Sequence, residues 1–170
     1  MILAVLLTLQ LLDGRAVDPF AGGQKATAFV FIHPDCPVSS RYAPELNRLS
    51  REYASRGIRF FVVYPGRDDD EAAIRTHYAE YGLEMPALRD RQFRLVDMAR
   101  ATMTPEAVVF DRERRLVYRG RIDDRAVRIG VWRATARRRE LADVLDRLAR
   151  SERVESSTTQ AVGCYIKPLS

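Results

Sequence analysis

The residues with the clearest chemical potential are the two cysteines of the chain, Cys36 and Cys164. Cys36 lies in the stretch HPDCPVSS (33–40), between an apolar run that predicts a buried strand and a pattern that predicts a helix. The amide groups and dipole of a helix N-terminus stabilise a thiolate and can lower a cysteine pKa from about 8.5 to about 3.5–7.5. A strand-to-helix turn at the edge of a sheet is usually accessible, so we expect Cys36 to be a reactive thiol rather than an inert, buried one.

Histidine supplies the alternatives to simple thiol chemistry, because metal sites and Cys–His hydrolases both use it. His33 and Cys36 could both ligate a metal, but no second cysteine lies close by, and we expect His77 on a helix far from the Cys36 turn. His33 also precedes Cys36 too closely to define the base of a hydrolase. We therefore predict no metal and no bound cofactor. His33 is expected to end a strand, where its protonated form would favour the Cys36 thiolate.

Hydrophobic periodicity predicts the elements that hold Cys36. Residues 27–33 (TAFVFIH) are almost wholly apolar, which is typical of a strand covered on both faces. Pro37 suits the first turn of the helix that follows, whereas Pro44 lies inside this helix and should kink it. Gly57 ends the helix, and residues 58–64 form a second buried strand. The predicted buried stripe of the helix consists of Val38, Tyr42, Leu46, Leu49 and Tyr53.

The remainder of the chain predicts, in order, two helices, a strand hairpin and a last helix. Asp68, Asp69 and Asp70 can cap the first of these helices, which stops at Gly82. Its buried side carries Ile74, Tyr78 and Tyr81. The second, short helix falls within residues 92–101, and the hairpin joins strands 106–110 and 115–119. The last helix is marked by Leu141, Val144, Leu145 and Leu148. The Ser- and Thr-rich residues 151–163 predict an extended or mobile tail.

The first twenty residues allow two interpretations. Residues 2–12 have the length of a signal-peptide core, but no basic residue precedes them and no Ala-x-Ala pattern follows. Alternatively, Leu7, Leu9 and Leu11 share one face of a strand, and the Asp-Gly pair at 13–14 turns the chain into a second strand. We favour a hairpin over residues 8–20. The predicted organisation is therefore an apolar stub at 1–7, one domain at 8–150 and a tail at 151–170.

Composition and charge exclude several classes of protein. A length of 170 residues suits one domain, and 46% hydrophobic with 30% charged residues is typical of a globular protein. No apolar stretch reaches the roughly 20 residues of a membrane-spanning helix, so no integral membrane segment is predicted. The net charge of +5 is spread over arginines interleaved with acidic residues, as in RIDDR (121–125). Because no basic stripe carries aromatic residues, we expect no nucleic-acid partner.

The order of the predicted elements is that of a thioredoxin-type α/β sandwich, and several motifs resemble one family of that fold. The apolar strand, the Cys-Pro-x-Ser turn (36–39) and RYAPEL (41–46) resemble the thioredoxin-like redoxin group of the AhpC/TSA superfamily. The closest similarity is to its peroxiredoxin-like branch, which has a single thioredoxin-type active-site cysteine. Further matches are MTP (103–105), YRGRIDD (118–124) and GCYIK (163–167). The resemblance covers residues 8–167 and implies a three-layer sandwich with a central mixed sheet and an N-terminal hairpin.

The resemblance also implies how a substrate is positioned. It makes Pro105 a cis-proline that faces Cys36, so that Thr104 presents its carbonyl and amide groups to an extended substrate. Pro37 and Ser39, in the turn after the cysteine, are expected to contribute to the same positioning.

Two departures from the family pattern limit the expected activity. Ser39 stands where thioredoxin has its second cysteine, so Cys36 has no local disulfide partner, and Ser39 either donates a hydrogen bond to the thiolate or caps the helix. His33 and Phe29 stand where a true peroxiredoxin has Thr or Ser and Pro, respectively. Efficient peroxidase activity is therefore not expected.

Cys164 offers a distant second thiol. The same Gly-Cys ending recurs in the resembling family, which implies that Cys164 resolves a sulfenic acid or mixed disulfide at Cys36. Two alternatives stay open at this point. Cys164 could be an unrelated surface thiol, or it could bridge two subunits.

Two functions of different classes follow. The first is a thiol–disulfide oxidoreductase that acts on a protein disulfide or a small oxidised thiol with an unidentified reductant, or, as a variant, a weak thiol peroxidase. The second is a redox-inactive module that binds an extended segment at the cis-proline surface. A disulfide between the cysteines suits an oxidising compartment, and the apolar N-terminus is compatible with export, so a periplasmic or secreted location is favoured over the cytoplasm.

Overall fold

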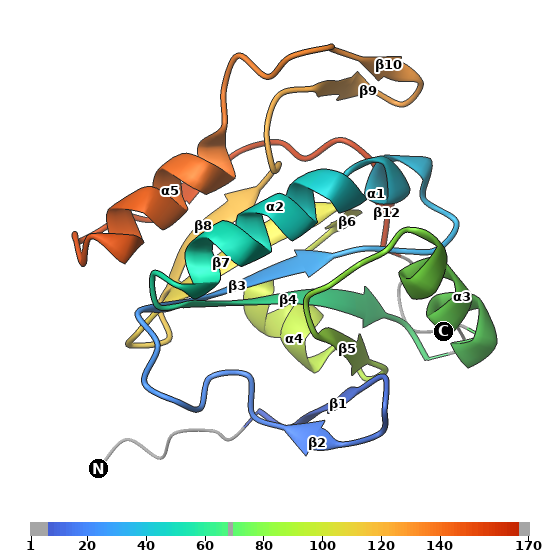
Figure 1. Ribbon diagram of the computed structural model, residues 1–170, viewed down its shortest axis with the longest axis horizontal. Coiled ribbons are helices and arrows are strands. Elements are labelled where there is room, and N and C mark those ends of the chain that lie inside the picture. The colour runs from blue at the N-terminus through green and yellow to red at the C-terminus, as the bar shows by residue number, and fades with distance from the viewer. Residues whose placement is uncertain (1–6, 68–69, 167–170) are drawn as a thin grey trace.

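The computed structural model describes residues 7–67 and 70–166, and its centre is an eight-stranded mixed sheet (Figure 1). The strand order is β11-β8-β7-β3-β4-β5-β1-β2. These strands are β1 (Leu9–Leu11), β2 (Ala16–Val17), β3 (Ala26–Phe31), β4 (Ile58–Pro65), β5 (Ala87–Asp90), β7 (Glu106–Asp111), β8 (Leu116–Gly120) and β11 (Ser157–Thr158). Two short pairs lie outside this sheet: β6 (Met103–Thr104) with β12 (Cys164–Tyr165), and β9 (Ala126–Arg128) with β10 (Val131–Trp132). The helices are α1 (Pro37–Arg41), α2 (Ala43–Ala54), α3 (Glu71–Glu80), α4 (Arg94–Ala99) and α5 (Glu140–Ala149).

The central strand β3 is covered on both faces, as its apolar sequence predicts. It pairs in parallel with β4 and antiparallel with β7. Ala28 and Val30 point to a core formed with α2, α3 and α5, whereas Phe29 and Phe31 point to a second core formed with α4 and the N-terminal hairpin. The molecule is therefore a three-layer α/β sandwich around a mixed sheet.

The chain after Cys36 forms two helices rather than one kinked helix. α1 ends at Arg41, Tyr42 separates the two, and Pro44 occupies the first turn of α2. Proline has no amide hydrogen to donate to a carbonyl one turn earlier, so the helix breaks where the sequence predicted a kink. All five residues of the predicted buried stripe lie in the core.

The predicted N-terminal hairpin is also present. Leu9 in β1 pairs with Val17 in β2, and β1 joins the edge of the main sheet through β5. Asp70 caps α3, since its carboxylate accepts a hydrogen bond from the Ala72 amide at 2.9 Å. Some of the predicted features lie outside the described residues: residues 1–6 of the predicted stub, the capping candidates Asp68 and Asp69, and Lys167. Within the described ranges, no helix has the length and apolar character needed to cross a membrane.

The C-terminal tail is extended, which is the first of the two predicted forms, and it is docked on the domain. β11 pairs in parallel with β8, and β12 pairs antiparallel with β6. Between them, the Thr159 amide donates to the Arg119 carbonyl at 3.0 Å, and the Thr159 hydroxyl lies 2.7 Å from the Tyr118 hydroxyl. Gly120 makes this approach possible, because a Cβ at that position would lie 2.1 Å from the Thr159 hydroxyl oxygen.

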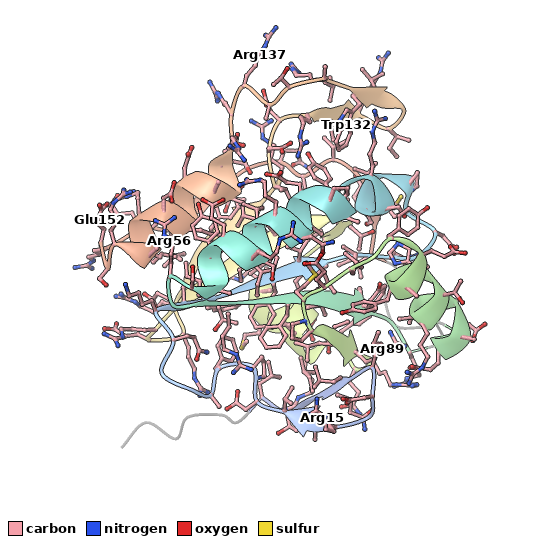
Figure 2. All side chains as sticks on the ribbon, in the orientation of Figure 1. Arg15, Arg56, Arg89, Trp132, Arg137 and Glu152 are labelled. Atoms are coloured by element: carbon pink, nitrogen blue, oxygen red, sulfur yellow. The ribbon has the colours of Figure 1, made fainter. Side chains whose placement is uncertain are left out.

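The arginines are dispersed, and several of them pair with acidic residues. Figure 2 places Arg15, Arg56, Arg89 and Arg137 on widely separated parts of the molecule. Arg15 forms an ion pair with Asp13, Arg56 with Asp146 and Arg89 with Glu71, at 2.7, 2.7 and 2.8 Å. The positive net charge is thus distributed over several surfaces.

Candidate active site

Cys36 lies between β3 and α1, where the first turn of α1 begins. Its thiol donates a hydrogen bond to the Thr104 carbonyl oxygen at 3.0 Å. The Thr104–Pro105 peptide bond is cis, as the family resemblance implied, and it brings β6 to face the cysteine. The expectation of an accessible thiol is wrong for this conformation. Cys36 is 1% exposed, because Thr104 and the docked tail cover it.

The tail brings Cys164 to the same place. In the β6–β12 pair, Cys164 lies opposite Thr104, and the Thr104 hydroxyl donates to the Cys164 carbonyl at 3.3 Å. Both cysteines are free thiols, and each one shifts the pKa of the other. Both also line a pocket of about 160 Å³ that opens beside His33. Two cysteines that are far apart in the sequence therefore share one site.

The surroundings make the two thiols unequal. Burial disfavours the Cys36 thiolate, but hydrogen bonds from the Ser39 side chain, the Cys164 thiol and the Ser39 amide outweigh burial and lower the pKa of Cys36. Burial, together with the hydrogen bond and negative charge of Cys36, raises the pKa of Cys164 to about 11. Cys36 is thus the more acidic thiol of the pair, and Cys164 is the less acidic one.

The Ser39 hydroxyl can accept one hydrogen bond and donate another at the same time. The His33 amide donates to the Ser39 hydroxyl oxygen at 3.4 Å, which leaves the hydroxyl hydrogen for the Cys36 sulfur. Pro37, the first residue of α1, is exposed beside Cys36, and Pro105 is buried behind Thr104. The structure therefore places every predicted site residue around the Cys36 sulfur or in the segments that flank it.

Replacement of Ser39 by alanine is expected to raise the pKa of Cys36 and slow its alkylation at neutral pH by about tenfold, the effect of losing one charge-assisted hydrogen bond. The pH at which alkylation is half-maximal therefore moves upward. The measurement is the rate of iodoacetamide reaction against pH, with Ser55→Ala on the exposed end of α2 as control. An unchanged profile in S39A would show that Ser39 does not stabilise the thiolate.

His77 joins the site through a buried hydrogen-bond chain, so its expected remote position is wrong. Its Nε2 lies 3.1 Å from the Ser40 hydroxyl, and its Nδ1 lies 2.8 Å from the Tyr64 hydroxyl. The Ser40 hydroxyl donates to the Cys36 carbonyl at 3.4 Å, so its oxygen accepts from His77 Nε2–H, and Tyr64 donates to Nδ1. Nothing in the spacing of Ser40, Tyr64 and His77 reveals this chain, because it joins three elements that meet only in the fold.

The same chain predicts a pH dependence of stability. Burial, and then the charge of His33, lowers the pKa of His77 below its value in the unfolded chain, near 6.5. The unfolded state therefore binds the proton first, and the free energy of unfolding should fall as the pH drops below about 6.5. Urea unfolding between pH 7.5 and 5 measures this slope. We expect His77→Gln to flatten it, and equal slopes in the two proteins would contradict the assignment.

Within the part of the chain that the structure describes, no group of three or more His, Cys, Asp or Glu side chains is placed to hold a metal ion. His33, Asp35, Cys36 and Cys164 line one pocket, but they are not arranged as a group that could hold a metal ion. The polar groups around the Cys36 sulfur are the Cys164 thiol, the Thr104 carbonyl and the Ser39 hydroxyl. This set suits sulfur chemistry.

Comparison with known proteins agrees with the geometry. Residues 6–128 match the Redoxin family. No curated protein matches the chain in sequence.

Three solved structures have the same fold. An uncharacterized conserved protein from Geobacillus kaustophilus is 25% identical, with a TM-score of 0.79 over 96% of this chain and 90% of that one. A hypothetical protein from Sinorhizobium meliloti is 22% identical, with a TM-score of 0.76 over 94% of this chain and 89% of that one. A secreted disulfide oxidoreductase from Mycobacterium tuberculosis is 19% identical, with a TM-score of 0.60 over 85% of this chain and 96% of that one.

These neighbours establish a thioredoxin-like fold, and the predicted peroxiredoxin-like branch stays a prediction. The family match covers more than half of the chain and includes Cys36 and the cis-proline. The protein belongs to the Redoxin family.

Proposed function

We propose that this protein is a thiol–disulfide oxidoreductase in which Cys36 attacks the substrate and Cys164 resolves the product. The observation that carries the proposal is the pair of free thiols that line one pocket beside the cis-proline and differ in acidity. Membership of the Redoxin family supports the reaction class.

The first step is attack of the Cys36 thiolate on one sulfur of a substrate disulfide. A new S–S bond joins Cys36 to that half of the substrate, the original S–S bond breaks, and the other half leaves as a thiolate that takes up a proton. Hydrogen bonds from Ser39 lower the pKa of Cys36 and so favour its thiolate form for this step.

The second step is attack of Cys164 on the Cys36 sulfur. Once Cys36 is part of a mixed disulfide, its negative charge and its hydrogen bond no longer raise the pKa of Cys164. Cys164 can then lose its proton to solvent and displace the second half of the substrate as a thiol. The substrate gains two electrons and two protons, and the protein retains a Cys36–Cys164 disulfide until an external thiol reductant reduces it.

The alternative, a redox-inactive binding module, needs the cis-proline surface for a foreign segment. β12 of the same chain already pairs with β6 at this surface, which favours the oxidoreductase over the binding module. We also propose that the domain spans residues 8–150 and that the tail from residue 151 serves to deliver Cys164. The secreted neighbour from Mycobacterium tuberculosis supports our proposal of an extracytoplasmic location.

The stoichiometry of a single turnover tests this function. Fully reduced protein is mixed with excess hydroxyethyl disulfide, and the released mercaptoethanol is quantified after the protein is removed. We expect two thiols released per chain, because both halves of the substrate leave. Release of no thiol would contradict the proposed reaction.

A further inference from the structure

We infer that residues 163–166 take the place of an extended polypeptide substrate, and that they thereby restrict Cys36 to low-molecular-weight disulfides. The inference rests on the proposed function and assigns its substrate class. The chemistry is unchanged: one small disulfide is reduced to two thiols, and the two cysteines are oxidised to one disulfide.

The first support is the pairing of β6. An extended peptide binds an exposed strand through backbone hydrogen bonds, and those groups of β6 are engaged by the tail. Cys164 lies opposite Thr104 and Tyr165 opposite Met103, and the Ile166 amide donates to the Thr102 carbonyl at 2.9 Å. A polypeptide substrate would have to displace this segment before it could pair with the same strand.

The second support is the close fit at Gly163. A Cβ on this residue would lie 1.9 Å from the Thr104 carbonyl oxygen and 3.0 Å from Pro105 Cδ. Real Cβ atoms do not approach so closely, so only glycine lets the tail cross the cis-proline at this distance. The sequence of the tail is thus matched to the surface that it covers.

The third support is the anchoring of the segment on both sides. Upstream, Thr159 is bound to β8 and Ala161 is buried. Downstream, Ile166 packs against the second core, on the face of the sheet that α4 covers. The covering segment is therefore anchored to the folded domain on both of its sides.

The fourth support is the space that remains. With the tail docked, Cys36 is 1% exposed and is reached through the pocket of about 160 Å³. Typical small-molecule sites measure about 300–1,000 Å³, so the space left beside Cys36 is small and suits one arm of a small disulfide better than a polypeptide segment.

The test compares two oxidants on fully reduced protein, with free cysteine as the reference thiol. One oxidant is hydroxyethyl disulfide and the other is a disulfide-linked dimer of a 20-residue unstructured peptide. Because β12 must open for the peptide alone, we expect wild-type protein to prefer the small disulfide over the peptide by about 100-fold beyond the preference of free cysteine.

Gly163→Val provides the matching variant, because it keeps both cysteines and forces β12 away from Thr104. We expect the ratio of peptide to small-disulfide rates to rise about tenfold in G163V. This ratio is the readout because a change in Cys36 acidity would affect both rates alike. Ser157→Val, an exposed substitution in β11 of the same tail, should leave the ratio unchanged.

A wild-type preference no greater than that of free cysteine would overturn the inference, as would an unchanged ratio in a G163V protein with native circular dichroism. Should G163V not fold, Ile166→Asp takes its place, because it opens the other end of the segment. The preference of the wild-type protein for the small disulfide, compared with that of free cysteine, also tests the inference without any variant. Failure of the proposed function is recognised separately. In that case Cys36→Ser reacts with hydroxyethyl disulfide as fast as the wild type does.

Discussion

Replacement of Cys36 by serine is expected to reduce the rate of oxidation by a small disulfide by a factor of about 10³ or more, because a neutral hydroxyl is not a useful nucleophile towards sulfur. Serine is close in size to cysteine, and its hydroxyl can still donate to the Thr104 carbonyl, so the fold should be retained. The measurement is the stopped-flow rate of thiol release from hydroxyethyl disulfide at pH 7.5.

The matched control for this prediction is Cys164→Ser, which removes the other thiol of the same site. If C36S were to release thiol at the wild-type rate while C164S did not, Cys164 would be the attacking residue and the assigned roles would be reversed. Native circular dichroism for both variants makes the comparison valid.

Replacement of Cys164 by serine is expected to stop the reaction after its first step. Cys36 still attacks, but nothing displaces the second half of the substrate, so the release falls from two thiols per chain to one. The protein should gain the mass of one mercaptoethanol adduct at Cys36, which intact-protein mass spectrometry detects. Two thiols from C164S, with no adduct, would show that Cys164 does not resolve the intermediate.

A second substitution at the same position separates resolution from activation. Serine can donate a hydrogen bond to Cys36 in place of the lost thiol, whereas alanine cannot. Cys164→Ala should therefore raise the pKa of Cys36 and slow the first step at neutral pH, whereas C164S should keep that step close to the wild-type rate. Both variants should stop at the mixed disulfide.

Local patterns in the sequence predict most of the scaffold. β3 and β4 are nearly continuous apolar runs, and the buried stripe through Leu46 and Tyr53 has helical spacing, so each element is visible without its neighbours. β5 was not predicted, because two of its four residues are charged and the segment lacks the apolar pattern of a buried strand. Arg89 and Asp90 are buried there because Arg89 forms an ion pair with Glu71 and Asp90 accepts hydrogen bonds from the Leu95 and Val96 amides of α4.

The candidate site was less accessible to sequence reasoning because it depends on contacts between distant segments. The position of Cys36 after a strand follows from pattern, but the cis-proline opposite it came from family resemblance alone. The docking of the tail depends on Gly120 and Gly163, whose missing Cβ atoms matter only once Thr159 and Thr104 lie against them. His77 likewise reaches the site through Ser40, a contact that no spacing along the chain encodes.

The central claim is that Cys36 and Cys164 form one redox pair, and a peptide map tests it most directly. Reduced protein at micromolar concentration is oxidised with a small disulfide, blocked with an alkylating reagent, digested without reductant and analysed by mass spectrometry. The account predicts a peptide pair that joins Cys36 to Cys164 within a single chain. Recovery of both cysteines as alkylated thiols, or of Cys36 joined to a second chain, would contradict it.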